Sequence, residues 1–99
     1  MLSANEIMHF LKKNKPYFKE HFHCTEIALF GSFARNEQRE DSDIDILVVF
    51  EPGTANLYDV EQKLKDYLNK RFNRKVDICA KKWINPIFKP MIMKDAVYA

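Results

Sequence analysis

The chain has 99 residues, of which 46% are hydrophobic, 13% aromatic and 30% charged, and its formal net charge is +2. This composition is typical of a small soluble globular domain and excludes the disordered and fibrous classes. No apolar run approaches the roughly 18 residues of a membrane span, and the N-terminus lacks a basic stretch followed by an apolar signal core. We therefore expect one domain over residues 1–99, in the cytoplasm and without membrane contact.

The first third of the chain is predicted to contain two helices and a strand. Ser3, with a glutamate three positions later, has the spacing of a capping box and opens a helix. A second, short helix is predicted over residues 16–22, because its first residue is a proline. Residues 25–30 form an apolar run closed by Gly31, which is the pattern of a buried strand.

The rest of the chain continues this alternation. Residues 44–50 are strongly apolar and predict a strand, and residues 57–72 repeat apolar side chains at helical spacing. Residues 75–80 predict a third strand with an aspartate on one face. Residues 83–98 are apolar and predict a turn, followed by a helix that begins at one of two prolines. Strands alternating with helices predict an α/β or α+β sheet domain.

The cysteines and histidines are assigned structural roles. Cys24 and Cys79 could form a disulfide in an oxidising compartment, but they need no partner in a reducing one, and we expect them to be unpaired. His21, His23 and Cys24 could hold a metal, but a zinc site usually needs a second ligand pair. A polar turn before a strand is therefore the preferred interpretation of this cluster.

Charge is distributed unevenly along the chain. Residues 37–51 hold six acidic residues and one basic residue, whereas the remainder holds 15 basic and 8 acidic residues. An acidic centre in a basic body can attract a cation and a polyanion together. The basic residues are scattered, which is typical of a solvated surface, so nucleic acid is not expected as a direct ligand.

Two aspartates stand at the start of the apolar run 44–50. Asp43 and Asp45 are two residues apart, and in an extended chain they point to the same face, about 6.5 to 7 Å apart at Cα. At about 5 Å and an effective dielectric near 20, two carboxylates repel by roughly 3 kcal/mol, which a bound cation would reverse. Asp77 adds a third carboxylate if its strand is the neighbour. Oxygen ligands of this kind suit Mg²⁺ better than calcium.

The turn before these aspartates has residues that suit phosphate binding. Gly31 lets the backbone approach a ligand closely, and Ser32 supplies a hydroxyl. The segment SFARNEQ has the makings of a helical turn, whose N–H groups would face an anion. Asn36 tolerates a positive φ and could end that turn. A Gly-Ser pair alone is common in ordinary turns, so its significance comes from the aspartates that follow it.

The combined pattern, "GSFARNEQREDSDIDILVVF" with a lone aspartate in a later strand, resembles the signature of the polymerase-β-like nucleotidyltransferases, and specifically their minimal members. The resemblance covers essentially the whole chain, up to an apolar C-terminal helix ending in DAVYA. It implies a mixed sheet flanked by helices, with Gly31 and Ser32 at the triphosphate of ATP. It also implies catalytic carboxylates, Asp43, Asp45 and Asp77, around two Mg²⁺ ions, with the last activating the incoming hydroxyl.

Two positions within the signature leave alternatives open. Arg35 either contacts phosphate, as part of the nucleotide site, or braces the acidic loop. Asn36 stands where the family usually has glycine. If a positive φ is required there, asparagine is the least costly replacement, so we expect the fold to be retained, whereas activity needs a test.

The resemblance also implies a partner. Minimal nucleotidyltransferases are commonly antitoxins of an all-helical HEPN ribonuclease toxin, which they neutralise by transferring AMP from ATP to a toxin tyrosine. A hetero-oligomer with such a toxin is the preferred prediction, since the chain has no extra domain to hold an acceptor. Two alternatives remain: an antitoxin that acts by contact alone, and a nucleotidyltransferase that modifies a small molecule.

The C-terminal residues 83–98 contain more apolar side chains than one helix face usually buries. These side chains either cover the sheet or form an interface with a partner. Both roles are compatible with the sequence.

Overall fold

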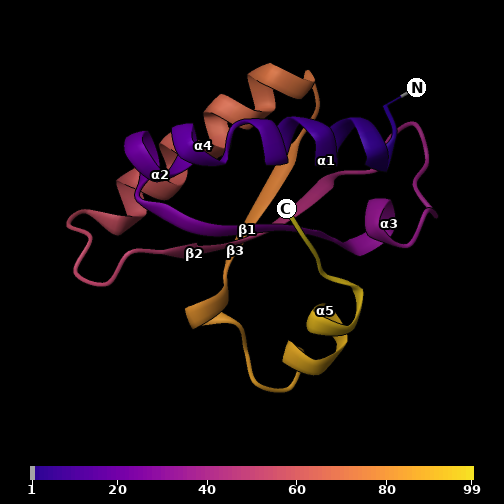
Figure 1. The fold of residues 1–99 in the computed structure, drawn as a ribbon. Coiled ribbons are helices and arrows are strands. Elements are labelled where there is room, and N and C mark those ends of the chain that lie inside the picture. The colour runs from indigo at the N-terminus through magenta and orange to yellow at the C-terminus, as the bar shows by residue number, and fades with distance from the viewer. Residues whose placement is uncertain (1) are drawn as a thin grey trace.

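The computed structural model describes residues 2–99, which are built around a four-stranded mixed sheet (Figure 1). The sheet order is β3-β2-β1-β4, where the strands are β1 (Cys24–Phe30), β2 (Ile44–Phe50), β3 (Val76–Ala80) and β4 (Val97–Tyr98). β1 is antiparallel to both β2 and β4, whereas β2 and β3 are parallel. Parallel neighbours need a long crossover, and α4 (Leu57–Phe72) provides it.

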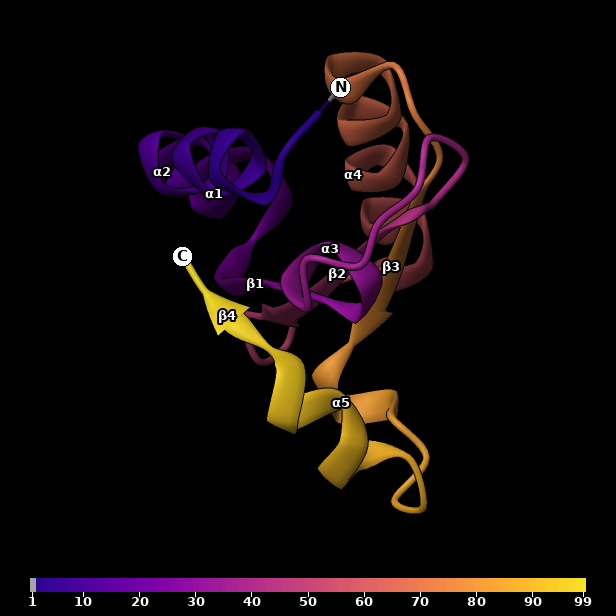
Figure 2. The same cartoon turned by 90° about the vertical axis from the view of Figure 1, so that its right-hand side faces the viewer.

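Helices lie on both sides of this sheet, as Figures 1 and 2 show. One face is covered by α4 together with α1 (Ala4–Lys13) and α2 (Lys15–Phe22). Beyond the other face lie the short helix η1 (Lys81–Trp83) and α5 (Lys89–Asp95), and the single turn α3 (Gly31–Ala34) follows β1. The prediction of a mixed sheet flanked by helices is confirmed.

The two N-terminal helices begin where the sequence predicts. The Ser3 hydroxyl accepts a hydrogen bond from the Glu6 backbone N–H at 3.2 Å, so the predicted N-cap is present. The second helix has Pro16 in its first turn, where a missing N–H costs nothing. It ends at His23, whose φ of 55° lies in the left-handed region.

Two apolar clusters hold the layers together. The larger cluster lies between the sheet and the three covering helices, and alternate residues of β2, Ile44, Ile46 and Val48, belong to it. The smaller cluster lies on the opposite face, where Leu47 packs with the buried Ile84. Because both faces of β2 are covered, its residues are almost continuously apolar, as the sequence shows.

The cysteines belong to different faces of the sheet. Cys24 lies in the larger cluster and Cys79 packs against the smaller one. Both are free thiols, in agreement with the expectation of unpaired cysteines. Among residues 2–99, no helix has both the length and the apolar character that crossing a bilayer requires.

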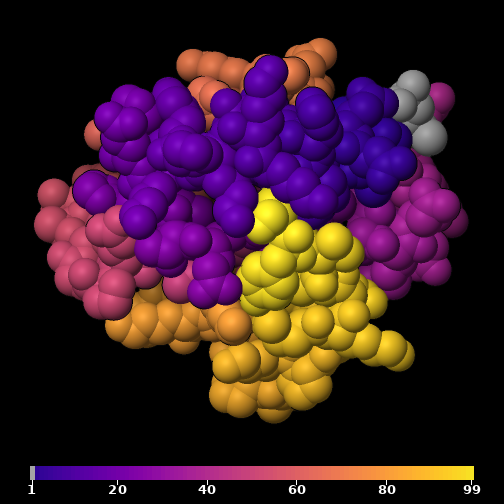
Figure 3. Space-filling model, in the orientation of Figure 1, coloured from indigo at the N-terminus to yellow at the C-terminus, as the bar shows by residue number. Residues whose placement is uncertain are grey.

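The prediction of a helix that continues through DAVYA is wrong. The last helix, α5, ends at Asp95, and Val97 and Tyr98 form β4 against the end of β1. β-branched and aromatic residues favour extended backbone, and the edge of β1 offers them N–H and C=O groups to bond. Figure 3 shows the C-terminal residues, in yellow, seated against the violet N-terminal part of the chain.

The apolar residues of the C-terminal segment divide between the two predicted roles. Ile84 is buried, and Ile92 and Met93 pack against the smaller cluster. Four large side chains remain exposed, with exposed fractions of 68%, 81%, 52% and 62% for Trp83, Ile87, Phe88 and Met91. The segment therefore covers the sheet with one side and presents an apolar surface with the other.

Candidate active site

The topology brings the predicted site residues to one end of the sheet. β1 ends where the antiparallel β2 begins, and Phe30 is the register partner of Asp45. On the other side of β2, the parallel strand β3 places Asp77 directly opposite Asp45. Figure 2 looks onto this end of the sheet, with α3 in front and α5 below it. The predicted neighbourhood of the two strands is therefore confirmed.

Gly31 occupies a position that no other residue could fill without strain. Its φ is +74°, in the region that L side chains rarely adopt. A Cβ at this position would also overlap the carboxylate of Asp45. The sequence predicted a close approach of the backbone to a phosphate ligand, which stays a prediction. In the structure the group that lies against Gly31 is the carboxylate of Asp45.

The single helical turn α3, which begins at Gly31, is held in place by a buried side chain. Phe33 is fully buried in the larger cluster, which fixes α3 against the sheet. The Arg35 backbone N–H donates to the Gly31 carbonyl oxygen at 3.1 Å and closes the turn. Asn36 follows with a φ of 59°, so this position does adopt the conformation for which glycine or asparagine is favoured. Ser32 lies at the surface of the same turn and lines the adjacent cavity.

The surroundings of Asp45 perturb its carboxyl group. Burial raises its pKa, and the negative charges of Asp77 and then Asp43 raise it further, while Arg35 opposes this effect. Asp43 and Asp77 are therefore both close enough to Asp45 to repel its charge. The Oδ2 of Asp43 lies 3.6 Å from the Nζ of Lys75, and both side chains are substantially exposed. Such a pair compensates little of the acidic charge.

These carboxylates offer the oxygen donors that a hard divalent cation prefers. Among residues 2–99, however, no three His, Cys, Asp or Glu side chains are arranged to hold a metal ion by themselves. Mg²⁺ commonly takes one or two carboxylates and completes its shell with water and phosphate oxygens. The donor set thus fits an ion that arrives with a phosphorylated ligand better than a permanently bound one.

Arg35 braces the loop and the last helix. Its Nε donates to Glu37 at 2.8 Å and its Nη1 donates to Asp95 of α5 at 2.8 Å. Hydrogen bonds to Glu37 and then Asp95 raise the pKa of the guanidinium. The structure shows these bracing contacts and adds Asp95 as a partner that sequence reasoning missed. Arg35 also lines the cavity beside the carboxylates, so its contact with phosphate stays a prediction.

An open cavity of about 430 Å³ lies beside these groups. Its walls combine the turn after β1 with the start of β2 and with α5, and its lining includes Gly31, Ser32, Asp43, Asp45 and Asp95. Asp77 is not in the lining, and it lies beside Asp45 as its register partner on the neighbouring strand. The contribution of α5 was not predicted, because no local spacing in the sequence places Asp95 beside residues 31–45.

The chain resembles known proteins over almost its full length. Residues 12–98 match the family model described as polymerase beta, nucleotidyltransferase. The protein adenylyltransferase MntA of Thermococcus cleftensis is 36% identical over 98 residues, which cover 99% of this chain and 97% of that protein. A solved structure described as a candidate minimal nucleotidyltransferase matches with a TM-score of 0.78 at 26% identity, over 97% of this chain and 95% of that one.

A solved toxin–antitoxin complex shares the fold at lower identity. It is described as a tri-AMPylated HEPN toxin of Shewanella oneidensis bound to its MNT antitoxin, and it matches with a TM-score of 0.58 at 21% identity. The match covers 96% of this chain and 66% of that one. Sequence signature, register of the aspartates and these similarities agree, and the chain therefore belongs to the polymerase-β nucleotidyltransferase family, in the minimal branch that includes MntA.

Proposed function

We propose that residues 1–99 act in the cytoplasm as one minimal nucleotidyltransferase domain that adenylylates a partner protein. The reaction transfers AMP from ATP, with Mg²⁺, to a tyrosine hydroxyl of a HEPN-type toxin and so neutralises the toxin. The observation that carries this proposal is the position of Asp45, opposite Asp77 in register and in contact range of Gly31. Clustered carboxylates that repel one another are costly unless a cation uses them.

Two kinds of similarity support the choice of reaction. The relative MntA, with 36% identity over nearly the whole chain, carries the name protein adenylyltransferase. A complex of the same fold is described as containing an AMPylated HEPN toxin. The free thiols Cys24 and Cys79 are consistent with a reducing compartment.

The three aspartates and the turn at Gly31 have separate roles in this proposal. Asp43 and Asp45 hold Mg²⁺ together with the phosphates of ATP, and Asp77 completes the acidic group. Bound Mg²⁺ supplies positive charge that neutralises the triphosphate as charge develops on it. Gly31 and Ser32 lie against the triphosphate in the cavity, where the absence of a side chain on glycine leaves room.

The chemical step exchanges one phosphorus–oxygen bond for another. The tyrosine oxygen attacks the α-phosphorus, the bond from that phosphorus to the oxygen bridging to the β-phosphate breaks, and pyrophosphate leaves with the bonding electrons. Asp77 accepts the proton of the tyrosine hydroxyl. Asp77→Asn should therefore lower kcat severely and leave the KM for ATP within about twofold, because this residue does not line the nucleotide cavity.

A second function, neutralisation by contact alone, is favoured by one observation. The exposed apolar side chains of η1, of α5 and of the turn between them could be covered by a partner without any chemistry; they are Trp83, Ile87, Phe88 and Met91. In that case the acidic site would be dispensable for antitoxin activity.

Transfer of labelled AMP separates the two functions. The protein is incubated with Mg²⁺, ATP labelled at the α-phosphate and the HEPN partner, and label on the partner is counted. Asp45→Asn should reduce transfer at least about 100-fold, because several kcal/mol of charge stabilisation are lost. Asp41→Asn, an exposed acid of the same loop, is the matched control and should retain activity. A partner that is neutralised equally by both variants and carries no label would establish contact inhibition instead.

A further inference from the structure

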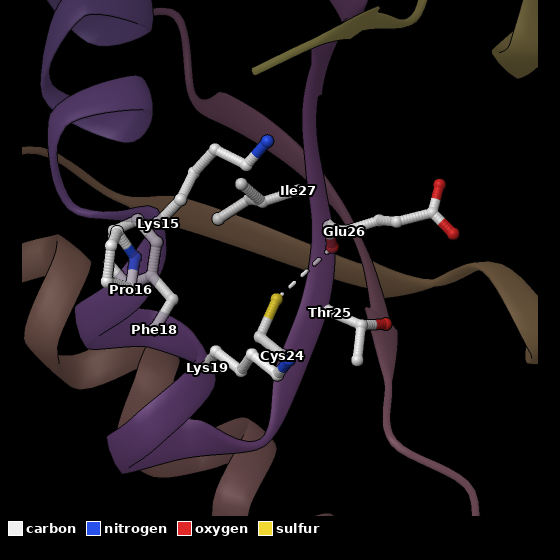
Figure 4. Close-up of a pocket in the computed structure, with 8 residues that line it drawn as sticks. All are labelled: Lys15, Pro16, Phe18, Lys19, Cys24, Thr25, Glu26 and Ile27. Carbon is white, nitrogen blue, oxygen red and sulfur yellow. Dashed lines mark hydrogen bonds between the residues drawn. The ribbon is translucent and has the colours of Figure 1, made fainter.

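Two cavities are lined partly by β1, and their linings differ in kind. The second cavity, of about 300 Å³, lies between α2 and β1. Figure 4 shows the side chains of Cys24 and Ile27 on the side of β1 that faces α2, and both are buried. The Cys24 Sγ donates to the Glu26 carbonyl oxygen at 3.2 Å, so this thiol is already bonded. The cavity beside the aspartates instead holds a charged side chain from a distant element, Asp95 of α5.

Asp95 brings a negative charge to a cavity that is proposed to hold a triphosphate. It adds a carboxylate to a lining that already contains Asp43 and Asp45. Its side chain is 19% exposed, and an unpaired charge there would repel phosphate groups. Within residues 2–99 the partner of this side chain is Arg35, whose Nη1 donates to the Asp95 Oδ2 at 2.8 Å. The charge of Asp95 is therefore directed at the guanidinium.

Two carboxylates hold the Arg35 guanidinium. Its Nε donates to Glu37 and its Nη1 to Asp95, both at 2.8 Å. A guanidinium has five N–H donors, so three remain, and none of these donates to another group of residues 2–99. Arg35 lines the cavity, and its charge is close enough to Asp45 to oppose the rise in the pKa of that carboxyl group. A planar guanidinium with free N–H groups is well suited to phosphate oxygens.

Of the two carboxylates, Asp95 is the firmer support for Arg35. The side chain of Glu37 lies on the loop after α3 and is 63% exposed, whereas that of Asp95 is 19% exposed. Water therefore screens the ion pair with Asp95 less. α5 is itself held against the sheet, because Ile92 and Met93 pack on the smaller cluster. The bond to Asp95 thus fixes the direction of a side chain that otherwise has many rotamers.

We propose that Asp95 is a positioning residue of the nucleotide site, which holds the Arg35 guanidinium at the cavity so that its free N–H groups bind the triphosphate of ATP. The inference rests on the proposed function, because it takes this cavity to be the ATP site. Asp95 itself touches no reacting atom, so its effect is on affinity. An arginine that is ordered in advance does not have to be ordered when the ligand binds, which strengthens binding by about two- to tenfold.

Calorimetric titration with two probes tests this role on the full chain without a partner protein. The probes are ATP and inorganic tripolyphosphate, each with Mg²⁺, and the second has neither base nor ribose. Asp95→Asn should weaken binding of both probes by the same factor, about five- to tenfold, because the affected contact is to phosphate. Asp95→Glu keeps the carboxylate and should recover most of the affinity. Asp66→Asn removes a negative charge from the exposed side of α4, outside the cavity, and should leave both affinities within about twofold.

A double-mutant cycle shows whether Asp95 acts through Arg35. Arg35→Gln should weaken binding of both probes, and Asp95→Asn should cause no further loss in that background. In the AMP-transfer assay Asp95→Asn should raise the KM for ATP by the factor found in the titration and leave kcat within about twofold.

The outcomes separate this inference from the proposed function. If Asp95→Asn binds like Asp66→Asn, or binds ATP weakly and tripolyphosphate normally, Asp95 supports only the fold of α5 and the inference fails. Tighter binding of both probes by Asp95→Asn would also refute it, because Asp95 would then withhold Arg35 from phosphate. A wild-type chain that binds ATP but not tripolyphosphate would contradict the inference alone, whereas one that binds neither probe would overturn the proposed function as well.

Discussion

Replacing Asp45 by asparagine should stabilise the protein when metal and nucleotide are absent. In the folded state burial raises the pKa of Asp45, and the charges of Asp77 and Asp43 raise it further. A carboxyl group with a raised folded-state pKa adds stability below its unfolded-state pKa, and this stability is lost as the pH rises through the folded-state value. At pH 7 the ionised group is therefore a net cost to folding, which asparagine removes.

The size of this cost follows from the register. Neighbouring strands lie about 4.8 Å apart, so the paired carboxylates of Asp45 and Asp77 are about 5 Å apart and repel by about 3 kcal/mol at an effective dielectric near 20. Asp45 and Asp77 are both only partly buried, so water and salt reduce the repulsion. We expect Asp45→Asn to raise the free energy of unfolding by about 1 kcal/mol, or the Tm by about 4–8 °C.

Urea unfolding in EDTA measures this effect directly, with Asp41→Asn as the control for loss of one acidic charge. The gain of Asp45→Asn at pH 7 should diminish as the pH falls through the folded-state pKa of Asp45, and it should be larger at low ionic strength. Addition of Mg²⁺ and ATP should stabilise the wild type and not this variant. An asparagine variant that is less stable than the wild type at pH 7 would refute the reasoning, because repulsion could not then dominate at this position.

Further predictions concern the residues around the site and the second cavity. Gly31→Ala should lower the free energy of unfolding by about 1–3 kcal/mol, because φ is +74° and the new Cβ meets a carboxylate. In the same urea assay Asn36→Gly should change the free energy of unfolding by less than about 1 kcal/mol, because glycine adopts the positive φ of this position readily. Asp95→Ala should remove the bond from Arg35 to α5, so amide exchange in α5 should become faster while exchange in α1 is unchanged. Cys24, with a pKa of about 11 and little exposure, should react with iodoacetamide at neutral pH far more slowly than a free thiol, and the rates should converge in urea.

Local sequence patterns predicted most of the fold. The apolar run of β2 was placed over residues 44–50 and the helical spacing of α4 over residues 57–72, because each pattern is long and both elements bury one or two faces. The alternation around Asp77 also indicated which face its carboxylate would share. Once β2 and β3 were assumed to pair, it followed that Asp45 and Asp77 would lie side by side on one face of the sheet.

What the sequence could not supply depends on contacts between distant segments. β4 consists of Val97 and Tyr98, which is too short for a periodic pattern, and it forms because the edge of β1 is available. The bond from Arg35 to Asp95 joins residues 60 positions apart, so no local spacing indicates it. The contact between Gly31 and Asp45 could not be predicted either. A glycine indicates that some group lies close to the backbone, but it does not identify the carboxylate of Asp45 as that group.

The central claim is that one site binds both the metal and the triphosphate. Its most direct test is a crystal structure with Mn²⁺ and a nonhydrolysable ATP analogue, in which anomalous scattering locates the metal. We predict a metal peak within ligand distance, about 2.0–2.3 Å, of both Asp43 and Asp45, with the triphosphate against Gly31 and Ser32 and Asp77 beside them. A metal or triphosphate bound elsewhere on the chain, with these aspartates unliganded, would contradict the account.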